Sequence, residues 1–505
     1  MATSRELATS GRTASFIPPM ALDFSSETPF YRQIATWFEN AIASGKLQPG
    51  QRVPSTRALA KELKVSRIPV LGAYKLLIEG GYLQTFVGAG TCVSVSMPDA
   101  LLSPQTEGRR DASAVEPQSL AKRTVSRRAL AMSGPARAWM QRCRGCTNLE
   151  QFPMAVWSKL LSRHIRKVSP DIMGHGDPMG YGPFREALAE FLGAFRAVKC
   201  DASQIMVTTG GQQALQIASL ALLDPKDSVW IEEPCYPGTL RALQAAGARL
   251  VPVPVDGTGL NVECGIERSK NARAAFVTPS HQMPLGVTMS ASRRAELLGW
   301  AARNGAWIIE DDYDSEYRFR GSPPASLQGL DRDGRVIYVG TLAEAMFPAL
   351  RLGYLVIPQD LIQSFLDVRN TTDTLATSVL YQMAMTDFIR EGHFSRHLRR
   401  MREVYKQARN ALAAAVAARM GGLLEMAGDE AGMRLLALLP AGIDDVEIAT
   451  KCPKTSATIY PLSECYMSPP QRGGLMIGYA NLDADDIPEL VKALKSLVTA
   501  KMRGR

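Results

Sequence analysis

Short apolar runs alternate with amphipathic segments from residue 136 to the end of the chain. Each run ends in polar or glycine-rich residues, and the segments between the runs carry apolar residues at helical spacing. The runs are IMVTT (205–209), VWIEEP (229–234), AAFVTPS (274–280), AWIIEDD (306–312) and VIYVG (336–340). Buried strands that alternate with helices predict an α/β sheet, whose ligand site lies at the carboxyl ends of the strands.

The N-terminal part of the chain has a different pattern, that of a small helical domain. Residues 30–43 carry apolar side chains at helical spacing, and a stretch rich in Gly and Pro ends this helix. Ser55 and Ser66 are natural N-caps for two further short helices. Residues 82–95 alternate and turn at glycines, which indicates a two-stranded wing. Two short helices joined by a tight turn predict a helix-turn-helix, here followed by the wing.

A helix-turn-helix has a definite chemistry toward DNA. Its second helix offers the first turn to base edges in a major groove, and phosphates are met around the start of the supporting helix. A small helical domain with exposed arginines would show the same pattern, so both explanations stay open at this point. The residues expected to contact DNA lie at the two helices and in the wing: Arg52, Ser55, Thr56, Arg57, Ser66, Arg67, Ile68, Tyr74, Gly88 and Gly90.

Composition separates these patterned regions from two others. Residues 1–22 are rich in Ser, Thr and Ala, and residues 96–135 are polar with several prolines and arginines. We expect a flexible arm and a linker there, with the DNA-binding domain at 23–95 and the large domain at 136–505. A length of 505 residues with 46% hydrophobic content is enough for more than one core.

The net charge and the cysteines add little to this prediction of the domain organisation. The net charge of +9 suits an anionic partner but equally an ordinary basic protein. The eight cysteines form no framework, and the pair Cys143 and Cys146 lacks the second pair that zinc requires, so we expect no metal site. No signal peptide and no apolar run of transmembrane length is visible, so we expect a cytoplasmic protein without a membrane partner.

Residues able to bind a planar phosphorylated ligand follow the predicted strands of the large domain. The helix that starts at Gly210-Gly211 offers backbone N–H groups to a phosphate, with which Arg351 can pair. Tyr236 can stack on a planar ring, and Asp311 can face a pyridinium nitrogen. Each residue alone also has an ordinary explanation, such as a turn tyrosine or a metal-type acidic cluster. Their order and spacing together indicate one site.

The segment 29–83 resembles the GntR-type winged helix almost throughout. The resemblance rests on the core PG-x-R-x-PS-x-R-x-LA-x-x-L-x-VSR and on the end A-Y-x-x-L-x-x-x-G-Y-L. It implies operator-specific binding to double-stranded DNA, usually as a dimer. The usual polar pair after VSR is Ile68-Pro69 here. Pro69 falls in the first helical turn, where a missing N–H costs little, but a threonine contact to phosphate is lost.

Residues 136–505 resemble the fold-type I, pyridoxal-phosphate-dependent aminotransferases. The matching segments are DP-x-GYGPFREALAEFL, GGQQAL, EEPCYPG, PSHQMP-x-G, IIEDDYDSEYR, FPALRLGYL and EGHFSRHLRRMR. With the GntR-like head, the chain is similar to the MocR subfamily of the GntR family. The predicted fold class is therefore α/β, an N-terminal winged helix-turn-helix plus a fold-type I aminotransferase-like domain.

The resemblance implies three groups of cofactor contacts. Asp311 would pair with the pyridine nitrogen, Tyr313 would hydrogen-bond the ring hydroxyl, and Tyr236 would stack on the ring. Two further sets complete the site: Gly211, Gln212, Thr341 and Arg351 at the phosphate, and His281 and Gln282 at the ring edge.

The chain departs from the family pattern at several of these positions. The pattern GT-F-SK-T-L reads GT-L-AE-A-M, so Glu344 takes the place of the Schiff-base lysine. A carboxylate cannot form an imine with an aldehyde, so we assign no catalytic residue. His175 replaces a tyrosine that reaches the phosphate of the partner subunit. The closing strand carries Met476 where an arginine for a ligand carboxylate is common, and the nearby Arg472 is expected at the surface.

Three outcomes stay open for this domain. It holds pyridoxal 5'-phosphate non-covalently, or it prefers pyridoxamine phosphate, whose ammonium could pair with Glu344, or cofactor binding is lost and the domain is a dimerisation scaffold. The retained Asp311, Tyr313, Thr341 and Arg351 favour a bound ligand. The charge of Glu344 would repel a phosphorylated ligand unless it is protonated or paired.

The sequence therefore predicts a sequence-specific, DNA-binding transcription regulator whose aminotransferase-like domain dimerises and senses a pyridoxal-phosphate-type effector. Its expected partners are operator DNA, this small-molecule effector and a second copy of the chain in a head-to-tail homodimer. The expected location is the bacterial cytoplasm, at the nucleoid when DNA is bound. The alternatives are an aminotransferase with residual catalysis, against which Glu344 argues, and a DNA-binding scaffold with a vestigial cofactor site.

Overall fold

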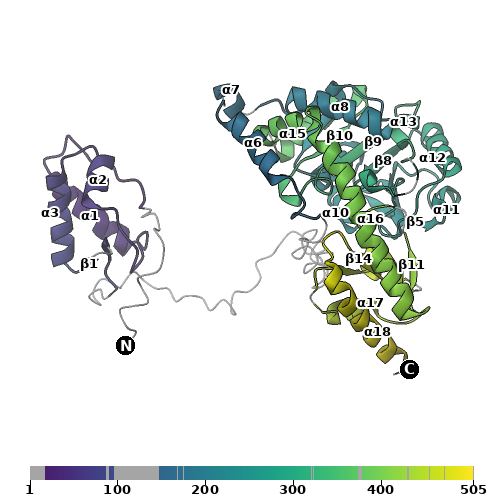
Figure 1. Ribbon diagram of the computed structural model, residues 1–505. Coiled ribbons are helices and arrows are strands. Elements are labelled where there is room, and N and C mark those ends of the chain that lie inside the picture. Colours follow the sequence, from purple (N-terminus) through teal and green to yellow (C-terminus); the bar gives the residue numbers. More distant parts are fainter. Residues whose placement is uncertain are drawn as a thin grey trace. The chain divides into compact units, whose positions relative to one another are not determined.

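The computed structural model describes residues 17–86, 90–95 and 147–503, except 168, 175, 320, 322, 374–377, 429–430, 454 and 471. Within these residues the chain forms two compact units (Figure 1). The predicted linker 96–135, most of the predicted arm, Gly88 and His175 lie outside the described residues. No helix in the described part of the chain is both long and apolar enough to cross a membrane.

The N-terminal unit is a helical bundle with a β-hairpin, as the sequence predicts. Its elements are α1 (Phe30–Ala43), α2 (Thr56–Glu62), α3 (Arg67–Glu79), β1 (Leu83–Phe86) and β2 (Gly90–Val93). Ser55 caps α2, since its hydroxyl accepts a hydrogen bond from the Ala58 amide at 3.2 Å. Ser66 is the N-cap residue of α3 without such a side-chain bond. The hairpin is antiparallel, which makes it the wing of a winged helix-turn-helix.

A mixed sheet of eight strands forms the centre of the C-terminal unit. The strand order is β3-β10-β9-β8-β7-β4-β5-β6. Strands β4, β5, β7, β8 and β9 run parallel, and β10 is antiparallel to both of its neighbours. The bounds are β3 (Ile205–Thr208), β4 (Ser228–Glu233), β5 (Arg249–Asp256), β6 (Gly259–Leu260), β7 (Ala274–Val277), β8 (Trp307–Asp312), β9 (Val336–Thr341) and β10 (Gly353–Val356). All five predicted apolar runs are strands of this sheet.

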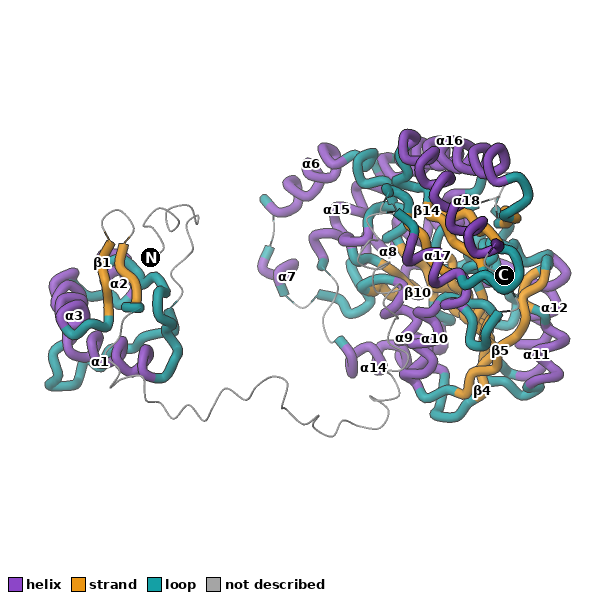
Figure 2. Tube along the Cα trace, turned by 90° about the horizontal axis from the view of Figure 1, so that it is seen from below, coloured by secondary structure: helices purple, strands orange, loops and turns teal. Residues whose placement is uncertain are grey.

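Helices cover both faces of the sheet, which is why its strands are apolar on both sides (Figure 2). One face packs Ile309, Ile337 and Val339 against α9, and the neighbouring residues Ile308 and Tyr338 belong to the cores on the other face. The helices of this part are α6 (Met154–Ile165), α7 (Pro170–Met173), α8 (Gly182–Arg196), α9 (Gly211–Leu222), α10 (Pro237–Ala246), α11 (Val262–Arg268), α12 (Ala291–Asn304), α13 (Leu327–Leu330), α14 (Ile362–Thr372) and α15 (Val379–Arg390).

A smaller subdomain completes the C-terminal unit. The long helix α16 (His393–Met420) leads into it and packs against α18 (Figure 1). Its four-stranded antiparallel sheet has the order β11-β12-β14-β13. The elements are β11 (Glu425–Ala427), β12 (Arg434–Leu438), α17 (Asp445–Lys451), β13 (Thr458–Pro461), β14 (Gly474–Gly478) and α18 (Ile487–Arg503). The subdomain brings the start of β12 to the edge of the large sheet, where the site lies.

Candidate functional site

A cavity of about 200 Å³ lies at the carboxyl ends of the parallel strands in the large sheet. Nine of the residues singled out in the sequence line it: Gly210, Gly211, Gln212, Tyr236, Asp311, Tyr313, Thr341, Glu344 and Arg351. The rest of the lining is Leu215, Thr278, Met283, Ala343 and Arg434. Segments more than two hundred residues apart in the sequence therefore meet in one site, and most of them lie next to one end of a strand.

One end of the cavity is built to hold an anion. The twelve-residue helix α9 begins at Gly211, directly after Gly210 at φ +124°, a conformation that suits glycine. A Cβ on Gly210 would stand 3.6 Å from the guanidinium carbon of Arg351, so this cation lies over the helix start. A Cβ on Gly353 would come within 2.6 Å of the Gly210 backbone, which shows how closely β10 approaches it. Backbone amides, a helix dipole and Arg351 together favour phosphate.

Asp311 is the only residue of the acidic run 310–312 that lines the cavity. Burial, together with the negative charges of Asp312, Glu232 and Asp314, raises the pKa of Asp311 to about 7. The carboxylate of Asp312 instead accepts hydrogen bonds from Arg196 Nε at 2.6 Å and from the Tyr338 hydroxyl at 2.5 Å. Because Asp311 is buried among negative charges, a protonated ring nitrogen in the cavity would stabilise its ionised form.

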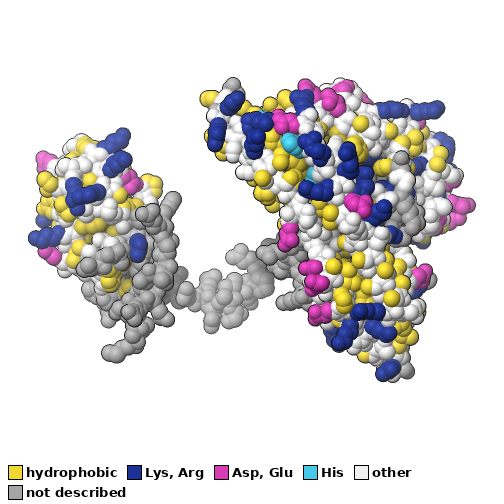
Figure 3. Space-filling model, viewed as in Figure 1, with side chains coloured by type: hydrophobic (Ala, Val, Ile, Leu, Met, Phe, Trp, Pro, Cys, Tyr) yellow, Lys and Arg dark blue, Asp and Glu magenta, His cyan; other side chains and the backbone are white. Residues whose placement is uncertain are grey.

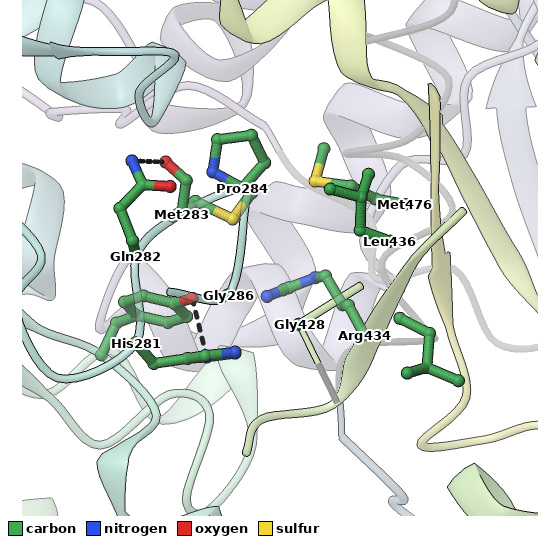
Figure 4. A pocket seen from close by; sticks show the side chains of 11 residues that line it. His281, Gln282, Met283, Pro284, Gly286, Gly428, Arg434, Leu436 and Met476 are labelled. Carbon is green, nitrogen blue, oxygen red and sulfur yellow. Dashed lines mark hydrogen bonds between the residues drawn. The ribbon is translucent and has the colours of Figure 1, made fainter. Parts of the chain in front are cut away.

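His281 and Gln282 line a smaller pocket beside the main cavity. This pocket of about 10 Å³ shares Met283, Tyr313 and Arg434 with the larger one (Figure 4). His281 Nδ1 lies 3.0 Å from both carboxylate oxygens of Asp314 and 3.2 Å from the Tyr313 hydroxyl. His281 and Gln282 are both buried. The contact with His281 thus orients the hydroxyl of Tyr313.

Gln282, like His281, supports the wall of the site. Its amide nitrogen donates to Glu232 Oε2 at 3.0 Å and to the Pro234 carbonyl at 2.8 Å. Burial raises the pKa of Glu232 to about 7, against the hydrogen bonds from Thr278 and Gln282 that lower it. Gln282 therefore ties the end of β4 to the loop after β7, and the structure places it in the wall of the site and not on the main cavity.

Arg434 is the charged residue of the cavity lining that the sequence did not single out. It is the first residue of β12, and its Nη2 atom lies 3.7 Å from Glu344 Oε1. The expected surface residue Arg472 instead pairs with Glu425 at 2.5 Å. Met476 lies in the neighbouring strand, opposite Leu436. The sequence does contain a signal for Arg434, because this residue begins the otherwise apolar run RLLALL. An isolated charge at the start of a strand is a candidate ligand contact.

The predicted DNA contacts that the structure describes are exposed or half-buried, except for one buried residue in α3. Ser55, Arg57, Ser66 and Arg67 are exposed, and Arg52 and Thr56 are half-buried. Arg67 Nε donates to Thr56 Oγ1 at 3.1 Å, which joins the starts of α2 and α3. Gly90, at φ +89°, begins β2 of the wing. Several Lys and Arg side chains stand on the visible face of this unit (Figure 3).

Two residues of α3 differ sharply in exposure. Tyr74 is 4% exposed, and its hydroxyl donates to the Pro54 carbonyl at 2.7 Å. Its expected place among the DNA contacts is therefore wrong, because it packs in the core and supports the loop before α2. Ile68, at the second position of α3, is 78% exposed. An exposed apolar side chain in the first turn of a recognition helix can contact the methyl group of thymine.

Comparison with known proteins agrees with this architecture. Residues 30–93 match bacterial regulatory proteins of the gntR family, and residues 147–494 match aminotransferase class I and II. The chain is 37% identical over 487 residues to the probable rhizopine catabolism regulatory protein MocR of Rhizobium meliloti, covering 95% of this chain and 96% of that protein. It is 31% identical over 396 residues to the pyridoxine biosynthesis transcriptional regulator PdxR of Corynebacterium glutamicum, covering 78% and 80%.

Solved structures support the same assignment for the C-terminal unit. A Pyrococcus horikoshii kynurenine aminotransferase, in complex with PMP, matches with a TM-score of 0.68 at 27% identity, covering 75% of this chain and 98% of that one. The predicted fold class is thus confirmed for both units. Since the relationship to MocR extends over almost the whole chain, the protein belongs to the MocR-type transcription regulators of the gntR family, which join a winged helix-turn-helix to a class I and II aminotransferase domain.

Proposed function

We propose that this regulator senses a phosphorylated pyridine of the pyridoxal type, held in the cavity without a covalent bond. One observation carries the proposal: the start of α9, Arg351 and the buried Asp311 converge on a single cavity whose wall holds Glu344. The resemblance to fold-type I aminotransferases implies a lysine at that position in the family pattern. The site can therefore hold the phosphate and the ring. A carboxylate stands at the position where an amine would be needed to bind the aldehyde covalently.

The residues present fit such a ligand. Amides of the α9 start, Thr341 and Arg351 would bind the phosphate, and Asp311 would hold the proton on the ring nitrogen. When bound, the pyridinium ring withdraws electrons and its aldehyde, if present, can react with amines. Glu344 cannot form a bond to that aldehyde, so the chain keeps the ligand by charge, hydrogen bonds and stacking on Tyr236 alone.

Glu344 does not make the cavity repulsive to an anion, because Arg434 lies beside it. Their opposite charges largely cancel, which leaves Arg351 and the helix start as the uncompensated positive end. This favours an anionic ligand at one end of the cavity. The name of PdxR, a regulator of pyridoxine biosynthesis, is consistent with a vitamin-derived signal in this family.

Binding in this cavity would regulate DNA binding through the dimer. Class I and II aminotransferase folds are typically dimeric, and we propose a head-to-tail homodimer for this chain. A ligand changes operator binding only if it favours one arrangement of the dimer over another. The two winged helices would then address paired half-sites whose spacing depends on that arrangement.

The test is a titration of the purified full-length protein with pyridoxal 5'-phosphate, followed by absorbance and by melting temperature. We expect a stabilisation that disappears on dialysis, because no covalent bond forms. Pyridoxamine phosphate is titrated in parallel, since its ammonium can pair with Glu344. The variant Arg351→Ala should lose the stabilisation, and Arg332→Ala, an exposed arginine in the turn before β9, serves as the matched control.

Each other result has a defined meaning. An absorbance band that survives dialysis and borohydride would show that a lysine elsewhere binds the aldehyde, and would refute non-covalent binding. Nitrogen exchange between an amino acid and an oxo acid would reveal residual catalysis. If neither pyridoxal compound shifts the melting temperature, the cavity is a vestige and the large domain a scaffold.

A further inference from the structure

The wing carries an exposed aromatic side chain that the sequence did not place among the DNA contacts. Phe86 is the last residue of β1 and is 49% exposed. In the antiparallel hairpin (Figure 2) it lies opposite Gly90, which has no side chain to cover it. A Cβ placed on Gly90 would meet nothing within 4 Å, so the ring does not fold back over this residue. The strand opposite Phe86 therefore leaves its ring uncovered.

The pairing register shows which face of the hairpin the ring occupies. Side chains alternate between the two faces of a strand, and paired residues of neighbouring strands share a face. Leu83 and Val93 are paired and belong to the core of the unit. Phe86, three positions after Leu83, therefore lies on the outer face, as does Cys92. Arg52 forms a bridge directly opposite Cys92, so this expected DNA contact shares the outer face with Phe86.

The short connection to α3 keeps the hairpin close to the DNA that this helix contacts. Helix α3 ends at Glu79, β1 begins at Leu83, and the two elements pack together. The three residues between them span at most about 10 Å. A helix in the major groove has the sugar-phosphate backbone and then the minor groove, about 6 Å wide, beside it. The outer face of the wing is therefore within reach of that minor groove.

The chemistry of the two side chains on this face is complementary. A phenylalanine side chain has no hydrogen-bonding group, so it cannot pair with base edges or with phosphate. Apolar side chains of this kind instead insert between base pairs from the minor groove, partly unstack them and kink the duplex. Burial of the exposed ring of Phe86 offsets part of the cost of unstacking. The guanidinium of Arg52 can bind a phosphate beside the kink.

We propose that Phe86 is a wedge that enters the minor groove of the operator and bends the DNA toward the major groove occupied by α3. The ring inserts between two neighbouring base pairs, and Arg52 holds the adjacent backbone. Insertion is easiest at the flexible steps TA and CA/TG, which unstack readily. The wing therefore adds a sequence preference at a step that no hydrogen bond reads. This inference concerns DNA recognition and does not depend on the effector of the large domain.

The test uses the full-length protein and an operator that this protein selects from random-sequence DNA. Each adenine of the operator is replaced in turn by 2-aminopurine, whose fluorescence rises when the base unstacks. Every flexible step of the two kinds contains an adenine on one strand, so the scan covers all of them. We expect the wild type to brighten one step in each half-site. Energy transfer between dyes at the two operator ends should report a bend of at least about 20°.

Variants assign the bend to the ring. Phe86→Ala should abolish the fluorescence rise and most of the bend, while Phe86→Leu, which keeps an apolar wedge, should retain part of both. Phe24→Ala is the matched control, because Phe24 is an exposed phenylalanine of the same unit that lies before α1, and it should behave as the wild type. Circular dichroism and melting temperature check that each variant folds.

A mismatched base pair gives a second measurement that does not rely on fluorescence. A mismatch at the brightened step lowers the cost of unstacking, so it should raise the affinity of the wild type at least about threefold and leave that of Phe86→Ala unchanged. The inference is wrong if the wild type binds its operator without unstacking or bending it. It is equally wrong if a folded Phe86→Ala unstacks and bends the operator as the wild type does. No pyridoxal compound enters the assay, so the result is independent of the proposed function.

Discussion

Restoring a lysine at position 344 should convert the site from non-covalent to covalent binding. In Glu344→Lys an amine replaces the carboxylate in a cavity that already provides the anion site and Asp311. The introduced amine would lie beside Arg434, which is 3.7 Å from the present carboxylate oxygen. A neighbouring positive charge disfavours the ammonium form, so it makes the lysine a better nucleophile.

The size of this effect follows from the distance. Two unit charges 3.7 Å apart at an effective dielectric of about 20 interact by roughly 4 kcal/mol. Solvent reaches both side chains, so we take about 2 kcal/mol, which lowers the lysine pKa by about 1.5 units, from about 10.4 to about 9. At pH 8 the reactive amine then rises from well under one hundredth to roughly a tenth of the molecules.

The assay is borohydride reduction of the protein with pyridoxal 5'-phosphate, followed by peptide mass spectrometry. Glu344→Lys should carry the reduced adduct on the peptide that contains residue 344, and the wild type should not. In Glu344→Lys/Arg434→Met the attachment at pH 8 should be roughly 25-fold slower, and the difference should fall below about twofold near pH 10.5. If the single variant binds the ligand reversibly but never covalently, residue 344 does not face the aldehyde, and the reasoning is refuted.

Three further changes probe other parts of the molecule. Ile68→Ala should weaken operator binding in a gel-shift titration. Replacing one operator thymine by uracil should lower the affinity of the wild type about tenfold and leave the affinity of the variant unchanged. Arg196→Met leaves Asp312 buried without its partner at 2.6 Å and should lower the unfolding free energy by about 3–5 kcal/mol, measured by urea denaturation; an effect below about 1 kcal/mol would contradict it. Asp311 has a folded pKa of about 7 against an ordinary 3.8, so its contribution to stability falls as pH rises from about 4 to about 7. Without ligand, Asp311→Asn should therefore melt higher than the wild type at pH 8 and equally near pH 4, and the opposite order would show that Asp311 has a cationic partner in the protein itself.

Much of this protein follows from short-range features of its sequence. Apolar runs bounded by polar residues located the five strands, because a strand buried on both faces must be apolar at consecutive positions. Residues that follow those runs, such as Tyr236 and Thr341, were expected at one edge of the sheet, and they line one cavity. The N-cap Ser55 and the hairpin after residue 82 were equally local signals.

The tertiary structure decided which side chains face each other. Glu344 and Arg434 belong to different subdomains, so no local pattern relates them, and only the docking of β12 beside the large sheet brings them to 3.7 Å. Tyr74 has the spacing of a helix residue that could face either DNA or the core, and packing against α1 buried it. Asp311 and Asp312 alternate along one strand, but only the helices that cover each face determined which one meets the cavity and which one meets Arg196. Long-range packing thus set the charge pattern of the site, because electrostatic interactions depend on distances in space and not along the chain.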